Sequence, residues 1–207
     1  MGISIIIPIY IIDEETIKMT KECIESYRKI MRKEDEVIVV DDCSPYPHDI
    51  PISIKSAKNS GNAHTWNLGA KIAKNPILLF SDNDIIAREM TGFREMIGTV
   101  TFPLVWNLKT QSMQNHVAGE CWAIRLDDFD RIGWVNEEYG SYFEDTDYFM
   151  RVIRSGGTLK VCNNAVVNHI SQGTFSKVKT PEELKQMFDR NKKLYESKFG
   201  QNYPFLS

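Results

Sequence analysis

The sequence predicts a single-domain α/β protein in which helices flank a mainly parallel central sheet. Short apolar runs rich in β-branched residues alternate with segments whose apolar residues recur every three or four positions, a pattern that indicates strands alternating with helices. The chain has 207 residues, which suffices for one domain with a sizeable core and leaves too little for two.

The first half of the chain supplies the order strand, helix, strand, strand, helix, strand. Ile3–Ile9 is a nearly continuous apolar run, as expected for a strand buried on both faces. A helix follows the acidic residues 13–15, because apolar positions between Ile17 and Met31 recur at helical spacing. We expect further strands at 37–40, 52–55 and 77–80 and a helix over 62–74. This order favours parallel strands connected by helices.

The second half of the chain is less regular. A helix beginning at Glu144 should end at Gly156, and Thr180 with Pro181 should start the last helix. The elements expected in this half are a helix near 86–98, strands near 99–106 and 119–125, a helix over 144–155, short extended pieces at 158–162 and 165–168, and a helix over 181–198.

Composition and charge exclude several classes of protein. Lys plus Arg number 25 against 28 Asp plus Glu, a formal net charge of -3, so nucleic acid is an unlikely partner. No apolar run approaches the roughly 20 residues that a membrane span needs, and the first residues lack a signal-peptide pattern; we expect a cytoplasmic protein. Cys23, Cys43, Cys121 and Cys162 form no Cys-x-x-Cys pair, which argues against structural zinc.

Acidic side chains gather where the predicted strands end. Asp41 and Asp42 follow one strand, and Asp82 and Asp84 follow another. Ligands bind beyond the carboxyl ends of strands in open α/β sheets, and neighbouring like charges are costly unless something neutralises them. A divalent cation with a diphosphate would do so, since such ions accept one or two carboxylates and complete their shell with phosphate and water. The alternative is that each Asp only forms a turn.

A third acidic segment begins a predicted helix at Glu144 and Asp145. A helix N-terminus stabilises an ionised carboxylate, and a carboxylate within reach of a sugar hydroxyl can act as a general base. The alternative is helix capping together with an Asp147–Arg151 ion pair at i,i+4.

With these segments in order, the chain resembles glycosyltransferase family 2, the GT-A enzymes that transfer sugars from nucleotide-sugar donors. The resemblance extends over nearly the whole chain. The similar segments are residues 3–10 (opening strand), 39–44 (second-strand signature), 59–61 and 67–69 (Gly and Asn-x-Gly helix), 79–84 (Asp-x-Asp element), 119–125 (acceptor stretch) and 144–147 (Glu-Asp helix).

The resemblance implies a donor and metal site. Asp42 would contact the base, Asp82 the ribose and cation side of the donor, and Asp84 the divalent cation, Mn²⁺ or Mg²⁺. His169 resembles a histidine that helps hold the metal or diphosphate in some relatives, so the implied metal ligands are Asp82, Asp84 and His169. The other implied donor-binding residues are Pro8, Tyr10, Ser44, Gly61, Asn67 and Asn83.

The resemblance also implies a reaction, sugar transfer with inversion. Asp145 would be the general base, with Glu144 beside it, while the metal neutralises the departing nucleoside diphosphate. Glu120 and Trp122 would lie at the acceptor. The implied donor is a UDP-sugar and the implied acceptor a hydroxyl of a glycan or glycoconjugate.

We expect successive segments of the chain to have different functions. Residues 1–84 should bind the nucleotide sugar, residues 85–180 should bind the acceptor and catalyse, and residues 181–207 should form a C-terminal helix and tail. Two alternatives stay open, a nucleotidyltransferase and a non-catalytic glycan- or nucleotide-binding module of the same fold. A nucleotidyltransferase should carry a glycine-rich basic loop after the first strand, whereas residues 10–15 are acidic and lack glycine.

Overall fold

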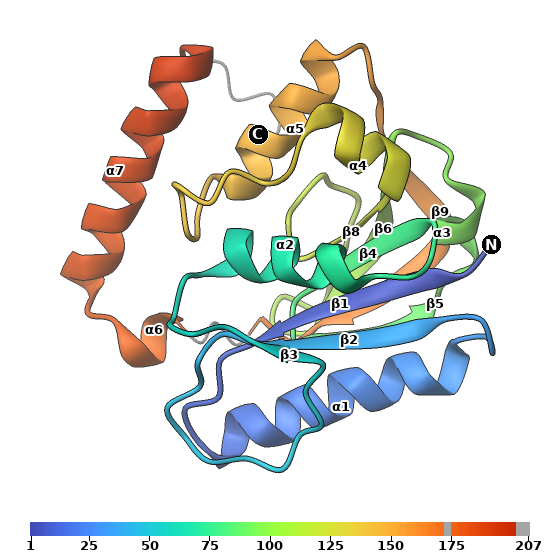
Figure 1. Cartoon of the computed structure of the whole chain (residues 1–207), viewed down its shortest axis with the longest axis horizontal. Coiled ribbons are helices and arrows are strands. Elements are labelled where there is room, and N and C mark those ends of the chain that lie inside the picture. The colour runs from blue at the N-terminus through green and yellow to red at the C-terminus, as the bar shows by residue number, and fades with distance from the viewer. Residues whose placement is uncertain (172–174, 202–207) are drawn as a thin grey trace.

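Helices cover both faces of a central sheet in the computed structural model of the chain (Figure 1). The structure describes residues 1–171 and 175–201. The first elements are β1 (Ile3–Ile9), α1 (Glu14–Ile30), β2 (Glu36–Asp41), β3 (Ile54–Lys55), α2 (Asn62–Ile72) and β4 (Ile77–Ser81). The later elements are β5 (Ile85–Glu89), α3 (Thr91–Glu95), β6 (Val100–Asn107), β7 (Ser112–Gln114), β8 (Cys121–Arg125), α4 (Leu126–Ile132), α5 (Glu144–Arg154), β9 (Leu159–His169), α6 (Phe175–Val178) and α7 (Pro181–Phe199).

The first four strands form the parallel part of the sheet. Within the described residues, nine strands make one sheet in the order β3-β2-β1-β4-β8-β6-β9-β5, and β7 pairs with β6. β1 is parallel to β2 and β4, and β2 is parallel to β3. β8 runs antiparallel to both β4 and β6, while β6 and β9 are parallel. The predicted α/β class is confirmed, and the far half of the sheet is mixed.

Successive side chains of β1 point to opposite faces of the sheet and so belong to two different apolar clusters. Ile5 and Ile7 belong to the apolar cluster that contains α1, whereas Ile6 belongs to the cluster that contains α2. All three side chains are buried, as expected for a central parallel strand. In Figure 1, α1 therefore lies on one side of the sheet and α2, α4 and α5 lie on the other. None of the helices in the described part of the chain is long and apolar enough to cross a membrane.

The predicted helix near 86–98 is wrong over its first part. Residues 85–89 form β5, which pairs antiparallel with β9, and only Thr91–Glu95 is helical. Ile85 and Ala87 are buried in the same apolar cluster as α1. The neighbouring strand and helix therefore outweigh the local pattern, as often happens at strands.

The two extended pieces predicted at 158–162 and 165–168 are one strand, β9. Its register with β6 shifts between Pro103 and Leu104, and this irregularity accommodates the residues between the two pieces. The sequence analysis did not predict β7, α4 or α6.

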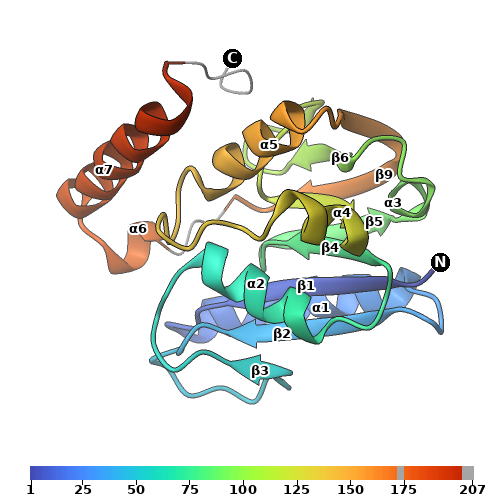
Figure 2. The same ribbon diagram turned by 45° about the horizontal axis from the view of Figure 1, so that its top comes forward.

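The last helix, α7, lies outside the two helical layers, beside the loop that precedes α5 (Figure 2). It begins as predicted, because the Thr180 hydroxyl accepts a hydrogen bond from the backbone N–H of Glu183. Its Tyr195 packs with Tyr139 and Phe143 of that loop. α7 therefore packs against the end of the molecule where the acidic segments lie close together.

Candidate active site

Two cavities meet at the carboxyl ends of β1, β2 and β4. The first, of about 490 Å³, is lined by the ends of β1 and β2, by residues 82–84 after β4 and by the start of α2; we call it the strand-end cavity. The second, of about 630 Å³, is lined by the acidic start of α5 and by several aromatic side chains; we call it the aromatic cavity. Asn62, Asp82 and Asp84 line both cavities, so the two spaces share one junction.

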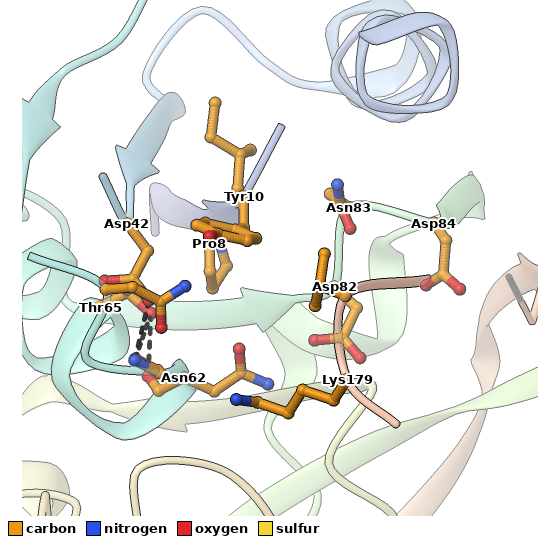
Figure 3. A pocket seen from close by; sticks show the side chains of 13 residues that line it. Pro8, Tyr10, Asp42, Asn62, Thr65, Asp82, Asn83, Asp84 and Lys179 are labelled. Atoms are coloured by element: carbon orange, nitrogen blue, oxygen red, sulfur yellow. Dashed lines mark hydrogen bonds between the residues drawn. The ribbon is translucent and has the colours of Figure 1, made fainter. Parts of the chain in front are cut away.

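This location follows from the order of the strands. α1 and α2 lie on opposite faces of the sheet, so the chain reverses its winding at β1, between β2 and β4. Ligands of open α/β sheets bind at the carboxyl ends of the strands at such a point. Pro8 and Tyr10 line the strand-end cavity at the end of β1, with Asp42 on one side in Figure 3 and Asp82 on the other.

Asp42 lies at its predicted place and fixes the loop that enters α2. Its carboxylate accepts hydrogen bonds from the backbone N–H groups of Ser60 at 2.9 Å and Gly61 at 2.8 Å. Burial raises the pKa of Asp42, and these two hydrogen bonds reduce the rise without cancelling it.

Gly61 lines the strand-end cavity at a position that only glycine fits. Its φ is +85°, and a Cβ would lie 2.6 Å from the carbonyl oxygen of Gly140. That oxygen accepts a hydrogen bond of 3.0 Å from the backbone N–H of Ala63. The start of α2 is thereby docked on the loop that leads to α5.

Asp82 and Asp84 lie where the two cavities meet. Burial raises the pKa of Asp82 well above its usual value, and the charge of Asp84 raises it further. His169, at the end of β9, has its Nε2 3.1 Å from Asp84 Oδ2. Burial lowers the pKa of His169, but the hydrogen bond and charge of Asp84 outweigh burial and raise it. Asn83 also lines the strand-end cavity, and its amide donates to Thr20 Oγ1 at 2.9 Å.

The predicted metal set of Asp82, Asp84 and His169 is only partly assembled. Asp84 and His169 are in contact, yet in residues 1–171 and 175–201 no three acidic, histidine or cysteine side chains are placed to hold one ion. An Mg²⁺-like ion bound to a diphosphate needs only one or two protein carboxylates. The residues therefore fit a cation that Asp84 and a diphosphate share, and they do not fit a metal held by three protein ligands.

Glu144 and Asp145 face the junction from the aromatic cavity, at the start of α5. Burial raises the pKa of both carboxyl groups. The shift of Asp145 is reduced by Thr146, whose backbone N–H donates to Asp145 Oδ1 at 2.6 Å. Gly119 packs against Oδ2, the other oxygen of Asp145. A side chain at position 119 would place its Cβ only 2.6 Å from this oxygen. The Asp145 carboxyl group is thus buried, fixed by Thr146 and Gly119, and has a raised pKa.

The turn before α5 is strained. Tyr142 and Phe143 have φ values of 67° and 69°, a region that residues other than glycine rarely adopt. The Asn191 amide of α7 lies 2.7 Å from the carbonyl oxygen of Ser141 and 2.9 Å from those of Tyr139 and Tyr142. α7 therefore stabilises the turn that orients the start of α5.

Glu120, the second predicted acceptor residue besides Trp122, lines the aromatic cavity. His116 Nε2 lies 2.9 Å from its Oε1. Burial would raise the pKa of Glu120, but the hydrogen bond and charge of His116 outweigh burial and lower it. This carboxylate is consequently held in its ionised form beside Asp145.

Three predicted site residues are placed elsewhere. The Trp122 side chain is 0% exposed and belongs to the aromatic core beneath α2 and α5. The Asn67 amide donates to the carbonyl oxygen of Val135 at 2.9 Å, and Ser44 Oγ donates to Asp41 Oδ1 at 2.6 Å. Among the described residues that line the two cavities, none of the three occurs. Neighbouring chain segments take up the polar groups of Asn67 and Ser44, whereas Trp122 Nε1 has no hydrogen-bond partner among the described residues. The three residues support the site without facing it.

Lys179 lines the strand-end cavity, although the sequence analysis did not single it out. Its side chain extends between Asn62 and Asp82 in Figure 3. Lys177, two residues earlier, lies 2.6 Å from Glu15 Oε2 at the start of α1 and so ties this segment to the rest of the cavity wall. A lysine in a polar stretch carries no sequence signal, and only the folded chain brings it to the carboxylates.

This arrangement, an α/β sheet with carboxylates where its winding reverses and a second acidic pair facing them, is that of the GT-A fold. Residues 4–100 match the sequence model of the family described as "Glycosyl transferase family 2". Over these residues the chain is similar to glycosyltransferase family 2. No curated protein sequence matches the chain closely enough to serve as a relative.

Solved structures share the fold at low sequence identity. Residues 1–349 of S. aureus TarS superpose with a TM-score of 0.67 at 18% identity, over 98% of this chain and 74% of that one. GalNAc-T7 with UDP, GalNAc and Mn²⁺ gives 0.70 at 15% identity, over 94% of this chain and 50% of that one. The mannosyltransferase of Pyrobaculum calidifontis with GDP-Man and Mn²⁺ gives 0.64 at 14% identity, over 94% and 69%.

Proposed function

We propose that the protein transfers a sugar from a nucleoside-diphosphate donor, with a UDP-sugar favoured, to a hydroxyl group of a glycan or glycoconjugate with inversion at the anomeric carbon. One observation carries this proposal. Asn62, Asp82 and Asp84 line both cavities, so a donor in one cavity and an acceptor in the other would meet at these side chains. TarS has also been solved with UDP-GlcNAc.

The strand-end cavity is proposed as the donor site. Its volume of about 490 Å³ falls in the range of roughly 300–1,000 Å³ that is usual for small-molecule pockets. Asp42 would lie toward the base and Asp82 toward the ribose, with Pro8 and Tyr10 between them. This placement would direct the diphosphate toward Asp84.

Two positive groups would balance the charge of the leaving diphosphate. A divalent cation, Mn²⁺ or Mg²⁺, held by Asp84 with His169 beside it, would act as a Lewis acid there. Lys179 is a second cation on the same cavity. Its ammonium group would contact phosphate oxygens, which favours the state in which the bond to the sugar has broken.

Asp145 is proposed as the general base. It would remove the proton of the acceptor hydroxyl while that oxygen bonds to the anomeric carbon and the bond from this carbon to the diphosphate oxygen breaks. Because Asp145 lines the aromatic cavity and Lys179 the strand-end cavity, the attacking and leaving oxygens would lie on opposite sides of the sugar. Displacement in this geometry inverts the anomeric centre.

The proposed division of the chain keeps residues 1–84 as the main donor-binding half and residues 85–180 as the acceptor-binding and catalytic half. Some residues do not follow this division, because Lys179 belongs to the second half and residues 184 and 188 lie beyond both halves. Lys179 lines the donor cavity, while Leu184 and Phe188 of α7 line the aromatic cavity.

A binding measurement followed by a turnover measurement tests the proposal. Thermal-shift titration with UDP and GDP in the presence of Mn²⁺ should raise the melting temperature, and a panel of nucleotide sugars should yield free nucleoside diphosphate by mass detection. A non-catalytic binding module would show the first effect without the second. Absence of both effects would refute the assignment of the donor site.

A further inference from the structure

The aromatic cavity has a wall that comes from α7. Leu184 and Phe188 line it together with the acidic start of α5. The Phe188 ring contacts those of Tyr142 and Phe143, with centroids 6.1 and 5.1 Å away. Phe188 nevertheless stays 42% exposed. A large aromatic surface is therefore open beside the acceptor carboxylates, although burying it would be favourable.

The same cavity contains two buried polar groups without a partner. Trp66 is 1% exposed and Glu144 is 5% exposed. In the described part of the chain, Trp66 Nε1 and Glu144 Oε2 find no hydrogen-bond partner, and both residues line the cavity. Leaving such groups unsatisfied costs roughly 1–3 kcal/mol each, so native proteins usually satisfy them.

The two unpaired groups differ in what they need. An indole N–H only donates, whereas a carboxylate oxygen accepts. A hydroxyl group can supply both, since its oxygen accepts while its proton is donated. A molecule that offers several hydroxyl groups along one edge would therefore satisfy the cavity better than an apolar chain.

We propose that the aromatic cavity binds a sugar ring of a saccharide acceptor, with its C–H face against Phe188 and Tyr142 and its hydroxyl edge toward Trp66, Glu144 and Asp145. This inference rests on the proposed function and makes α7 part of the acceptor site. C–H groups of a pyranose carry partial positive charge and pack on the negative face of an aromatic ring. A lipid chain would cover Phe188 but leave the buried polar groups unpaired.

Phe188→Ala, Phe188→Tyr and the control Lys193→Ala, an exposed residue on the following turn of α7, test the proposal. Each UDP-loaded protein is titrated with maltose, cellobiose, lactose and chitobiose by saturation-transfer NMR, and decyl phosphate serves as the lipid probe. We expect at least one disaccharide to bind the wild type, Phe188→Ala to weaken it tenfold or more, and Phe188→Tyr and Lys193→Ala to stay within threefold. UDP affinity should be unchanged in all.

Each contrary outcome has a distinct meaning. If the wild type binds UDP but binds none of the disaccharides, or binds only decyl phosphate, the saccharide subsite is refuted. Disaccharide binding that Phe188→Ala leaves unaltered also refutes it. Failure of the wild type to bind any nucleoside diphosphate would instead refute the proposed function, on which this inference depends.

Discussion

Asn191 Nδ2 of α7 lies 2.9 Å from the carbonyl oxygen of Tyr142, in the strained turn that leads into α5. The asparagine is fully buried, and the same amide contacts the carbonyl oxygens of Tyr139 and Ser141. A helix near the C-terminus therefore stabilises the conformation that presents Glu144 and Asp145 to the junction of the cavities.

Replacing Asn191 with Leu should lower both stability and turnover. The variant removes the amide partner of the buried Ser141 carbonyl oxygen, at a cost of about 1–3 kcal/mol, and a small displacement of the base can lower the rate about 100-fold. Urea unfolding and single-turnover assays at a temperature where the variant is folded measure the two effects. Lys193→Ala should change neither. A folded Asn191→Leu protein with wild-type turnover would show that α7 does not position the base.

Asp145→Asn should remove the general base without affecting the donor site. The amide keeps the shape and the hydrogen bond from Thr146, so the expected change is a fall in kcat of about 10²–10⁴-fold with unaltered affinity for the nucleoside diphosphate. Asp127→Asn, at the start of α4, is the matched control. Near-normal turnover in Asp145→Asn would exclude the assigned role.

Asp84→Asn should abolish the metal dependence of donor binding. In the wild type, EDTA should weaken binding of UDP, and Mn²⁺ should restore it. The variant should bind UDP weakly with or without Mn²⁺, because the ion keeps too few protein ligands. Isothermal titration in both conditions provides the comparison. Equal stimulation by Mn²⁺ in the variant would assign the ion to other residues.

Lys179→Ala should weaken the binding of UDP by removing a contact with its phosphates, and it should leave the binding of the nucleoside unchanged. Comparison of UDP with uridine isolates the phosphate contribution to affinity. The variant should lose roughly 10- to 150-fold of this contribution, since a hydrogen bond to a charged group contributes about 1.5–3 kcal/mol. Uridine affinity should stay the same. Lys185→Ala, exposed on α7 and paired with Asp189, is the control. If the UDP-to-uridine ratio is unchanged in Lys179→Ala, the lysine does not contact the diphosphate.

The Asp35–Arg94 pair should make the fold sensitive to acid. Burial opposes ionisation of Asp35, but hydrogen bonds from Arg94 and from the backbone outweigh burial and hold the pKa of this carboxyl below its usual value. Because the folded-state pKa is depressed, the stabilisation is complete above the unfolded value of about 3.9 and is lost as pH falls through the folded value.

Asp35→Asn tests this dependence. The variant should be less stable than the wild type by roughly 3 kcal/mol at neutral pH, because Arg94 is left buried without its partner. The difference should shrink below about pH 4. Urea unfolding across a pH series measures both curves. If the difference in stability between the two proteins does not depend on pH, the lost stability comes from packing and not from the charge of Asp35.

Local sequence signals were sufficient to place the carboxylates of the strand-end cavity. Asp42 directly follows β2, and Asp82 and Asp84 follow β4 within three residues, so all three could be placed at one edge of the sheet from periodicity and topology alone. Glu144 and Asp145 were likewise found because they begin a strongly amphipathic helix.

Other parts of the site depend on contacts between distant segments. Trp122 was expected at the acceptor but is buried, and Lys179 and Phe188 were not expected in the site but line its cavities. A sequence pattern shows that a side chain is apolar or charged, but not which surface its neighbours leave open.

By itself, the sequence determined the α/β class, the parallel strands and the acidic residues that end them, because these follow from the spacing of neighbouring residues. Only the tertiary structure decided which polar groups stay accessible, how α7 supports the turn before α5 and where the two cavities join. Those features result from packing between elements that are far apart in the chain. The spacing of neighbouring residues does not show which of these elements pack together.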